Sequence, residues 1–472
     1  MLPGERPGQH DESGDNPSAS VATAGELFGL VVTTDALASA TSDRAWLLAM
    51  LSFEAALARA EANLGVVPAD AALAIERCCH EPWDDLTPAA LGRRGRLSGN
   101  PAVPFVAELR SRLPAGAARW AHFGATSQDV LDSALMLVAR EVLDIVITDV
   151  GRLATAAAGL AERHRGDIVP ARTLLQHAAP TTFGVKAAGW LVAALEASEA
   201  LQRVRRERLS VQLGGPAGTL AALGPPGPRV VEDLARGLGL HAPVVPWHTN
   251  RLRVVELAGA LTASAGVAAK VALDVALLMQ TEVSEAFEPA APGRGGSSSL
   301  PQKRNPAMAS AVAAAWRQAL GAASVVVGAM AQEHERAVGA WQAEHQPFTL
   351  LARSAGGAVA VAADILSGLE VDASRMEADV RLTRGLLLAE RATLALSAHL
   401  PEPDARRAVE QASQRAAVSG ADLERELRLD PQVADALSET PGDVFDPAGW
   451  VGSADAFVER ALAFYRRVNE VG

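Results

Sequence analysis

The sequence predicts a mainly α-helical protein: a long central helical bundle with smaller N- and C-terminal helical domains. Aromatic residues are only 4% of the chain, and alanine and leucine dominate its 49% hydrophobic content. Alanine and leucine both favour helices, whereas the alternating β-branched residues that are typical of strands are scarce. Shifts in composition predict a disordered tail at 1–22, an N-terminal domain at 23–115, the bundle at 116–370 and a C-terminal domain at 371–472.

The predicted helices follow in order along the chain. Ser42 or Asp43 caps a first helix, and Gly65 is placed to stop it. Five longer apolar helices are expected at about 129–164, 182–212, 250–287, 306–335 and 348–369. A helix of thirty residues is about 45 Å long. These segments are apolar on more than one face, so we expect burial on several sides and a bundle shared between copies of the chain.

Charge and motif content argue against several partners and cofactors. The formal net charge of −12 is the opposite of what a phosphate-binding surface requires, so no nucleic-acid partner is expected. Uncharged apolar runs stay shorter than the eighteen or so residues of a membrane span, so no membrane partner is expected. Neither a G-x-G-x-x-G turn nor a P-loop lysine occurs in a suitable context, and no cofactor is predicted.

The two cysteines, Cys78 and Cys79, are adjacent, and no further thiol exists to build a disulfide framework. This suits a reducing compartment and predicts a cytoplasmic protein. Adjacent thiols next to His80 lack the spacing of zinc ligands, and His334 and His345 lie at mixed spacing. We therefore expect no metal, and we expect both cysteines to be buried in a helix.

A loop rich in glycine and serine at 293–299 leads through Lys303 and Asn305 to Pro306 at the predicted start of a long helix. The lysine charge, the amide and free backbone donors of the helix start would together hold a carboxylate and stabilise a dianionic intermediate. A nearby serine would act as a base. By composition alone, a flexible linker followed by a proline-started helix explains the same residues.

The order Gly-Ser-Ser-Ser-Leu-Pro-Gln-Lys-Arg-Asn-Pro at 296–306 resembles the signature loop of the fumarase/aspartase superfamily, with Leu300 where that family usually has Met. The resemblance implies that Ser297, or alternatively Ser298, is the general base that removes a proton from the carbon next to a carboxylate. It also implies that Lys303 and Asn305 bind substrate. A serine base requires loop closure, exclusion of water and neighbouring donors.

A second segment places Thr126, Ser127 and Gln128 at the start of a long helix. Alone it reads as an ordinary capped helix start, but with the loop it resembles the carboxylate-binding T-S-x-D segment of the superfamily. His122 matches a histidine of the adenylosuccinate lyase and carboxymuconate branches, where it would bind substrate or transfer a proton. A shorter match at 98–101 implies that Asn100 contacts the substrate.

A third segment at 171–178 resembles the R-T-H-x-Q stretch of the superfamily, with Gln176 and His177 as substrate-binding candidates. Leu174 occupies the position of the histidine that protonates the leaving group in many members. Ammonia and hydroxide need that proton at neutral pH, whereas a stable anion departs without it. The sequence therefore favours elimination of a stable anion.

The whole pattern resembles the 3-carboxy-cis,cis-muconate cycloisomerase branch, which also includes nitrosuccinate lyases. Leu300, Gln302 and Leu252 depart from the cycloisomerase pattern beside expected substrate positions, so we prefer a diverged lyase that converts nitrosuccinate to fumarate and nitrite. Arg251, Arg336 and His177 are unranked candidates to receive the nitro group. Cycloisomerase activity is the alternative.

A non-catalytic helical scaffold is a further alternative, because helical pattern alone does not separate it from an enzyme. Ser297, Lys303 and Asn305 favour the enzyme. The resemblance also implies a homotetramer with composite active sites built from three subunits, acting on a small dicarboxylate-type substrate. Trp247 and Trp341 are expected to be packing residues.

Overall fold

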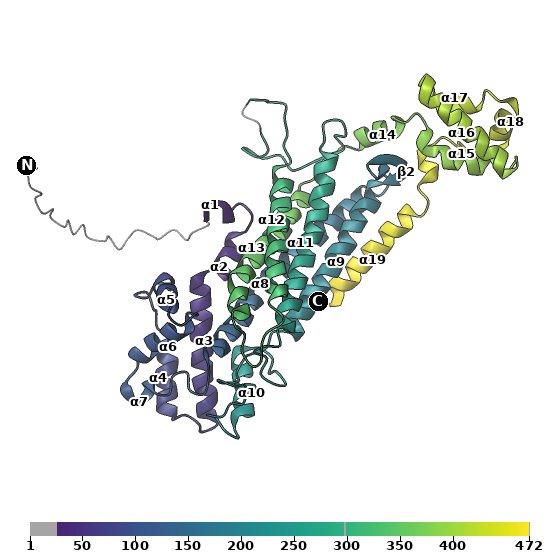
Figure 1. Cartoon of the computed structure of the whole chain (residues 1–472). Coiled ribbons are helices and arrows are strands. Elements are labelled where there is room, and N and C mark those ends of the chain that lie inside the picture. The colour runs from purple at the N-terminus through teal and green to yellow at the C-terminus, as the bar shows by residue number, and fades with distance from the viewer. Residues whose placement is uncertain (1–25, 297–298, 472) are drawn as a thin grey trace, which may run out of the picture.

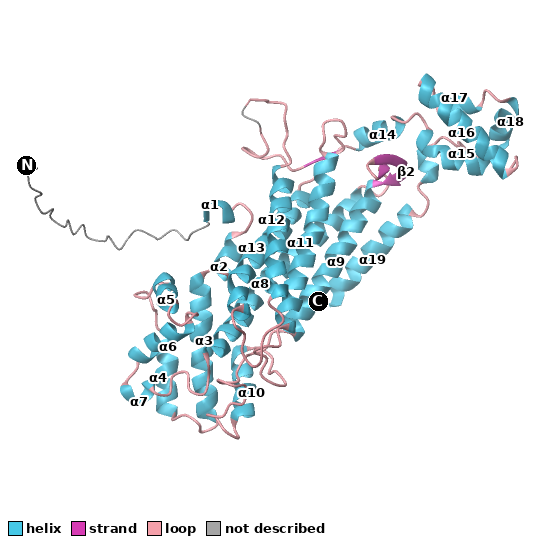
Figure 2. Cartoon of the chain, in the orientation of Figure 1, coloured by secondary structure: helices cyan, strands magenta, loops and turns pink. Residues whose placement is uncertain are grey.

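The computed structural model describes residues 26–296 and 299–471, and its fold is mainly α-helical, as predicted (Figures 1 and 2). Long helices lie side by side in a central bundle. They are α8 (Ser127–Arg163), α9 (Phe183–Glu207), α11 (Leu252–Leu278), α12 (Ala307–Gly328), α13 (Ala340–Ser367) and α19 (Ala454–Val471). One continuous core runs through this bundle and into the N-terminal helices.

The N-terminal helices lie beside the bundle, most of them at one end of it (Figure 1). They are α1 (Glu26–Gly29), α2 (Asp35–Ala40), α3 (Asp43–Asn63), α4 (Ala69–His80), α5 (Pro88–Gly95), α6 (Ala102–Ser111) and α7 (Ala115–Ala118), and α10 (Gly227–Leu238) joins them on α3. The Ser42 side chain accepts the Ala45 N–H at 3.1 Å, and Gly65 has φ +69°. The predicted first helix is confirmed, with Ser42 as its cap.

The five long predicted helices are present, but their ends differ from prediction. Helices α9, α11 and α12 end at Glu207, Leu278 and Gly328, earlier than expected. Helix α13 starts earlier than expected and passes through Pro347. Because proline usually ends a helix, the sequence pattern favoured a start after it. Packing of the apolar face of α13 on α8, α11 and α12 overrides that local preference.

A β-hairpin after α8 was not predicted. Strands β1 (Ile168–Thr173) and β2 (Gln176–Thr182) pair antiparallel, with an irregularity between Pro170 and Arg172. Pro170 stands opposite Pro180, and prolines argue against a strand when the sequence alone is considered. A second short pair, β3 (Ala286–Phe287) with β4 (Glu370–Val371), joins the segments after α11 and α13.

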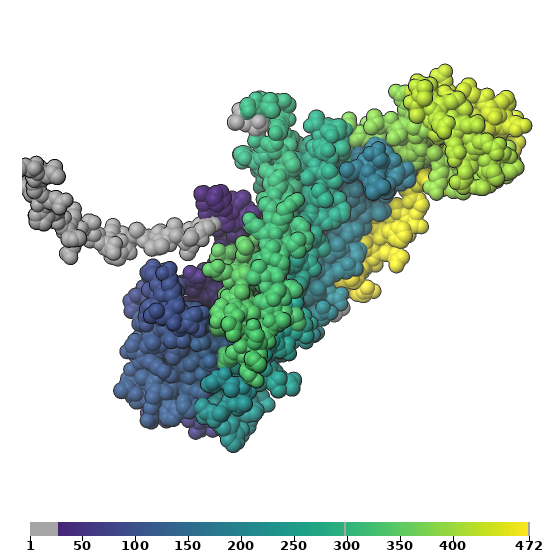
Figure 3. Space-filling model, in the orientation of Figure 1, coloured from purple at the N-terminus to yellow at the C-terminus, as the bar shows by residue number. Residues whose placement is uncertain are grey.

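The predicted C-terminal domain at 371–472 needs one correction. Its middle part is a separate small unit with its own core, and it projects from the end of the bundle (Figure 3). That unit contains η1 (Leu386–Leu388), α15 (Ala389–Leu396), α16 (Glu402–Ser419), α17 (Leu423–Leu427) and α18 (Pro431–Glu439). Before it, α14 (Ala373–Arg381) packs on β1 and contributes Met376 to the main core, and after it η2 (Pro447–Trp450) contacts β2. Helix α19, however, runs back along α9 and α8 and contributes Val458 and Leu462 to the main core.

In the described part of the chain, three bundle helices are long and apolar enough to cross a membrane by length and composition: α11, α12 and α13. Within this chain, 72% of the most apolar stretch of α13 is buried, whereas only 44% of the corresponding stretch of α11 and 33% of that of α12 are buried. Helix α12 lies along one face of the bundle with exposed Leu320, Val325 and Val327 (Figure 3). The chain alone therefore leaves extended apolar helix faces uncovered.

Candidate active site

The start of α8 is held by one buried carboxylate. The Asp129 Oδ2 atom accepts the Thr126 N–H at 3.0 Å and the Gly215 N–H at 2.9 Å. Its Oδ1 atom accepts the Gly214 N–H at 3.1 Å and lies 2.6 Å from His248 Nε2. Asp129 thereby fixes the backbone on which Thr126 and Ser127 stand, which orders two hydroxyls at a helix N-terminus before any ligand arrives.

Gln128 and Arg336 meet beside this helix start. The Gln128 Nε2 group donates to Asp132 Oδ2 at 3.1 Å and to the His248 carbonyl at 2.8 Å. Arg336 donates to Gln128 Oε1 at 3.1 Å and to the Gly215 carbonyl at 2.7 Å. Burial lowers the pKa of Arg336 below its ordinary value. The structure thus joins two predicted residues that are far apart in sequence.

Arg251 does not have the environment expected of a leaving-group receptor. Its side chain is fully buried and binds Asp132 with two hydrogen bonds, at 2.7 and 3.0 Å. It also binds Glu344, at 2.5 and 3.0 Å. Burial lowers the pKa of Arg251, but the two carboxylates outweigh it and raise that pKa above the ordinary value. Because its guanidinium group already binds Asp132 and Glu344, Arg251 has a structural role here.

Trp247 and Trp341 contact the same buried charged residues. The Trp341 Nε1–H donates to Asp132 Oδ1 at 3.0 Å. The Trp247 Nε1–H donates to the Val211 carbonyl at 2.8 Å, and its ring lies under the Arg251 guanidinium at 4.9 Å. Both are buried, so their prediction as packing residues is confirmed. We call Asp129, Asp132, Arg251 and Glu344 with their partners the network end of the bundle.

His122 lies at this end, four residues before Thr126. Its Nδ1 atom is 2.5 Å from Glu54 Oε1 on α3, and its backbone has φ +61°. Burial lowers the pKa of His122, but the charge and hydrogen bond of Glu54 raise it further, so the net shift is upward. Asn100 lies in the N-terminal domain, where its amide closes a local turn with Ser98 and Ala102.

The hairpin carries the third predicted segment at the other end of the bundle. Arg172 binds Glu285 with hydrogen bonds of 2.8 and 2.7 Å and so anchors the hairpin to the segment after α11. Leu174 lies at the hairpin turn, 97% exposed, with φ +51°. Gln176 is exposed, and His177 is half-buried. Burial, followed by the Arg172 charge, lowers the pKa of His177, which keeps the ring neutral.

The signature loop lies at the same end as the hairpin, and we call this the loop end. Ser297 and Ser298 lie outside the described residues. The Asn305 N–H donates to the Gly295 carbonyl at 2.8 Å. Gly295 has φ +66°, and a Cβ atom there would lie 2.6 Å from the Asn305 carbonyl oxygen, so this closure requires glycine. Lys303 is exposed.

One expectation about the loop is wrong. The N–H groups at the start of α12 were expected to be free for a substrate carboxylate. Glu288 accepts those of Met308, at 3.1 Å, and Ala309, at 2.7 Å. The sequence did not reveal this protein carboxylate because it lies twenty positions upstream. Lys303 and Asn305 therefore remain as the candidate anion-binding groups of the described loop.

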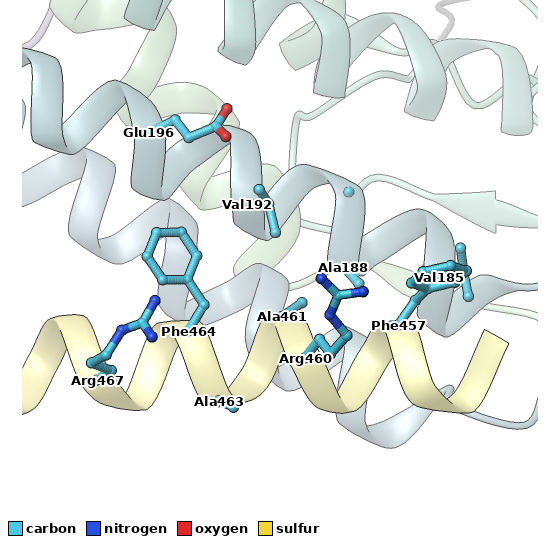
Figure 4. Close-up of a pocket in the computed structure, with 11 residues that line it drawn as sticks. Val185, Ala188, Val192, Glu196, Phe457, Arg460, Ala461, Ala463, Phe464 and Arg467 are labelled. Carbon is cyan, nitrogen blue, oxygen red and sulfur yellow. The ribbon is translucent and has the colours of Figure 1, made fainter. Parts of the chain in front are cut away.

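Within one chain, the network end and the loop end are far apart. Ser127 starts α8 and the hairpin follows its last residue, Arg163; 37 residues at about 1.5 Å each span roughly 55 Å. Figure 1 shows the signature loop beside the hairpin end. A hollow of about 790 Å³ between α9 and α19, lined by Val192, Phe457 and Phe464 among others, contains none of the predicted residues (Figure 4).

Comparison with known proteins identifies the family. A family model described as "Lyase" matches residues 29–321, and one described as "Adenylosuccinate lyase C-terminus" matches residues 385–461. The chain belongs to the fumarase/aspartase superfamily. A cycloisomerase-type branch is also supported: a 3-carboxy-cis,cis-muconate cycloisomerase of Bradyrhizobium diazoefficiens is 43% identical, over 92% of this chain and 97% of that protein.

Two further relatives extend this placement. A nitrosuccinate lyase of Streptomyces davaonensis is 41% identical, over 90% of this chain and 91% of that protein. The crystal structure of a 3-carboxy-cis,cis-muconate lactonizing enzyme from Pseudomonas putida has a TM-score of 0.87 and 40% identity, covering 94% of this chain and 99% of that one. This member of the superfamily is an enzyme, and the scaffold alternative is set aside.

Sequence reasoning missed the residues that order the site. Glu54, Asp132, His248 and Glu344 are distant in sequence from the positions they support. One sequence pattern could have identified Glu54: it and Glu61 are acidic residues seven positions apart on an otherwise apolar helix face. Acidic side chains are rarely fully buried without a reason. Cys78 and Cys79 are buried in α4, as predicted.

Proposed function

We propose that the protein is a lyase that removes a proton next to a carboxylate of a substituted succinate and expels a stable anion, with nitrosuccinate giving fumarate and nitrite. The observation that carries this proposal is Leu174. It occupies the place of the usual acid histidine, at an exposed turn, and supplies no proton. Nitrous acid is ionised at neutral pH, so nitrite leaves as an anion and needs no proton from the enzyme.

The elimination balances without an external reagent. Ser297 takes the proton from C3, and the C3–H electron pair enters the carboxylate next to it as a dianionic intermediate. Collapse of that intermediate forms the C2–C3 double bond. The C–N bond breaks with its electron pair on nitrite. Lys303 and Asn305 at the loop end hold the carboxylate on which charge develops, because a fixed cation and amide stabilise that charge in a dry site.

The network end binds the other carboxylate in this proposal. Thr126 and Ser127 supply hydroxyls, and His122 and Arg336 complete the polar surface, while the buried Gln128 acts by holding Arg336. Their positions are set by buried hydrogen bonds, so little ordering remains to be done on binding. Gln176 and His177 approach from the hairpin. His177 or Arg336 receives the nitro group, since Arg251 is occupied by two carboxylates.

The site is formed between copies of the chain, in a homotetramer. The support is the separation of roughly 55 Å along the 37 residues of α8 and the uncovered apolar faces of α11 and α12. Antiparallel packing of these helices on neighbouring copies would cover the apolar faces and bring one network end to another chain's loop end. We place the reaction in the cytoplasm, with no cofactor.

Cycloisomerase activity on 3-carboxy-cis,cis-muconate is the second candidate. Its support is the relative of that name at 43% identity. The same argument from Leu174 applies, since the reverse of lactone formation expels a carboxylate, which is also a stable anion.

One assay separates the two. The purified protein is incubated in turn with nitrosuccinate, carboxymuconate, an argininosuccinate-type substrate and an adenylosuccinate-type substrate, while ultraviolet absorbance and nitrite are followed. Nitrite and fumarate in equal amounts are the expected result. Carboxymuconate turnover without nitrite release would overturn the preferred function in favour of the cycloisomerase.

A further inference from the structure

A buried carboxylate from the N-terminal domain reaches the proposed site through His122. Glu54 lies on α3, and its side chain is completely buried. Its Oε1 atom lies 2.5 Å from His122 Nδ1, while its Oε2 atom is buried and unpaired within the described part of the chain. The histidine side chain keeps 11% exposure, so the pair extends from the core to the protein surface beside Thr126.

The backbone of His122 indicates that its position is enforced. Its φ of +61° lies in the left-handed region, which costs a non-glycine residue free energy and persists where surrounding contacts hold it. The Ala121 carbonyl just before it accepts hydrogen bonds from Arg110 Nε at 3.3 Å and from Arg110 Nη2 at 3.0 Å. The ring is therefore held from two sides, by Arg110 through the backbone and by Glu54 through Nδ1.

We propose that Glu54 is a positioning residue: it holds the His122 ring by Nδ1, so that the Nε2–H points to the site and binds a carboxylate of the substrate. This rests on the proposed function only in taking the ligand to be a dicarboxylate. A carboxylate bonded to one ring nitrogen fixes the tautomer and orientation of the other. The N-terminal domain is then part of the binding apparatus as well as of the fold.

The charges around the ring act in the same direction. Glu54 on α3 and Asp129 on α8 raise the pKa of His122, whereas burial and Arg110 on α6 lower it, and the net shift is upward. A protonated ring binds a carboxylate better than a neutral one. Affinity is thus present below the pKa of His122 and is lost as pH rises through it. Removal of the Glu54 charge moves that loss to lower pH.

Glu61 offers a matched control on the same helix. It is also completely buried, but both of its carboxyl oxygens lack a hydrogen-bond partner among the residues that the structure describes. Burial, then the Glu54 charge, raises its pKa to about 9, so it is uncharged at neutral pH. Glu61→Gln therefore changes a buried acid to an amide seven positions from Glu54 without touching His122.

The experiment measures fumarate binding by titration calorimetry between about pH 5 and 8, the range in which histidine titrates. Glu54→Gln should weaken binding about 10- to 100-fold near neutral pH, the scale of a lost hydrogen bond to a charged group. As the pH rises, the affinity of this variant for fumarate should also be lost at a lower pH than the affinity of the wild type. Glu54→Asp, which keeps the charge, should recover part of the affinity, and Glu61→Gln should bind like the wild type.

Combining Glu54→Gln with His122→Asn should weaken binding no more than His122→Asn alone, because Glu54 acts through the histidine. Additive losses, or a Glu54→Gln pH profile that matches the wild type, would overturn the proposal. Thermal melting of each variant separates these outcomes from misfolding. Nitrite release plays no part in these titrations, so its absence in the wild type would count against the proposed function alone.

Discussion

The two ends of the helical bundle are built in opposite ways. At the network end, Arg251 is fully buried between Asp132 and Glu344, and Gln128 and Arg336 are held by the same set of bonds. At the loop end, Lys303 and Leu174 are exposed. The difference teaches that the polar groups at the network end are ordered within the single chain, whereas the described candidate groups at the loop end are exposed and await a further surface only in the proposed assembly.

This contrast gives different expectations for substitutions at the two ends. A change at the loop end should affect turnover with little effect on folding. A change at the network end should affect folding first, because a buried charge without its partner is costly.

Ser297→Ala is expected to lower the turnover number by about 10²–10⁴-fold, the usual contribution of a general base. Fumarate affinity and melting temperature should change little, since the loop lies outside the core. The measurement is nitrite release under saturating nitrosuccinate. Ser299→Ala is the matched control and should retain activity. Near-normal turnover in Ser297→Ala, with a large loss in Ser298→Ala, would transfer the role to the second serine.

Arg251→Met is expected to lower the free energy of unfolding by about 3–5 kcal/mol, because it leaves two buried carboxylates without their cation. Calorimetric melting measures the loss. Arg253→Met is the control: Arg253 lies over the same Trp247 ring at 4.7 Å, but Asp132 and Glu344 bind Arg251. Equal losses in both variants would show that stacking, and not the buried ion network, stabilises this end.

Glu61→Gln should raise the melting temperature by an amount that increases with pH. In the folded protein the pKa of Glu61 is about 9, against an ordinary value of 4.5. Between these values the unfolded chain releases a proton that the folded chain keeps, so wild-type stability falls as pH rises. The amide does not titrate. The difference should be small near pH 4.5 and reach several degrees by pH 9; a constant difference would contradict the buried, protonated acid.

Leu174→His should change nitrite release by less than about two-fold, because a stable anion gains nothing from a proton donor. Leu175→His is the control, since that residue is also exposed and has φ +67°. A large rate increase in Leu174→His alone would mean that departure of the leaving group is limited by proton transfer, which would weaken the argument for nitrite.

The sequence predicted the fold class and the positions of the long helices, because helical periodicity and caps such as Ser42 are local signals. Helix ends were less predictable, since tertiary packing carries α13 through Pro347. The hairpin was missed because Pro170 and Pro180 argue locally against strands. The candidate site residues were chosen through sequence motifs, whose order is visible in the chain, and they stay predictions.

What the sequence did not reveal was which groups are already occupied. Arg251 looked like a free cation, and only the structure shows Asp132 and Glu344 around it. The start of α12 looked like an anion site, and only the structure shows Glu288 on its N–H groups. These contacts join residues far apart in sequence, and no local pattern predicts them.

The central claim is that the two ends meet between different chains, and co-assembly of two defective variants tests it most directly. Chains carrying Ser297→Ala are mixed with chains carrying His122→Asn, dissociated and reassembled, and nitrite release is measured against each variant assembled alone. If each site takes Ser297 and His122 from different chains, random assembly restores about a quarter of the wild-type sites. Activity no greater than the average of the two variants would contradict the account.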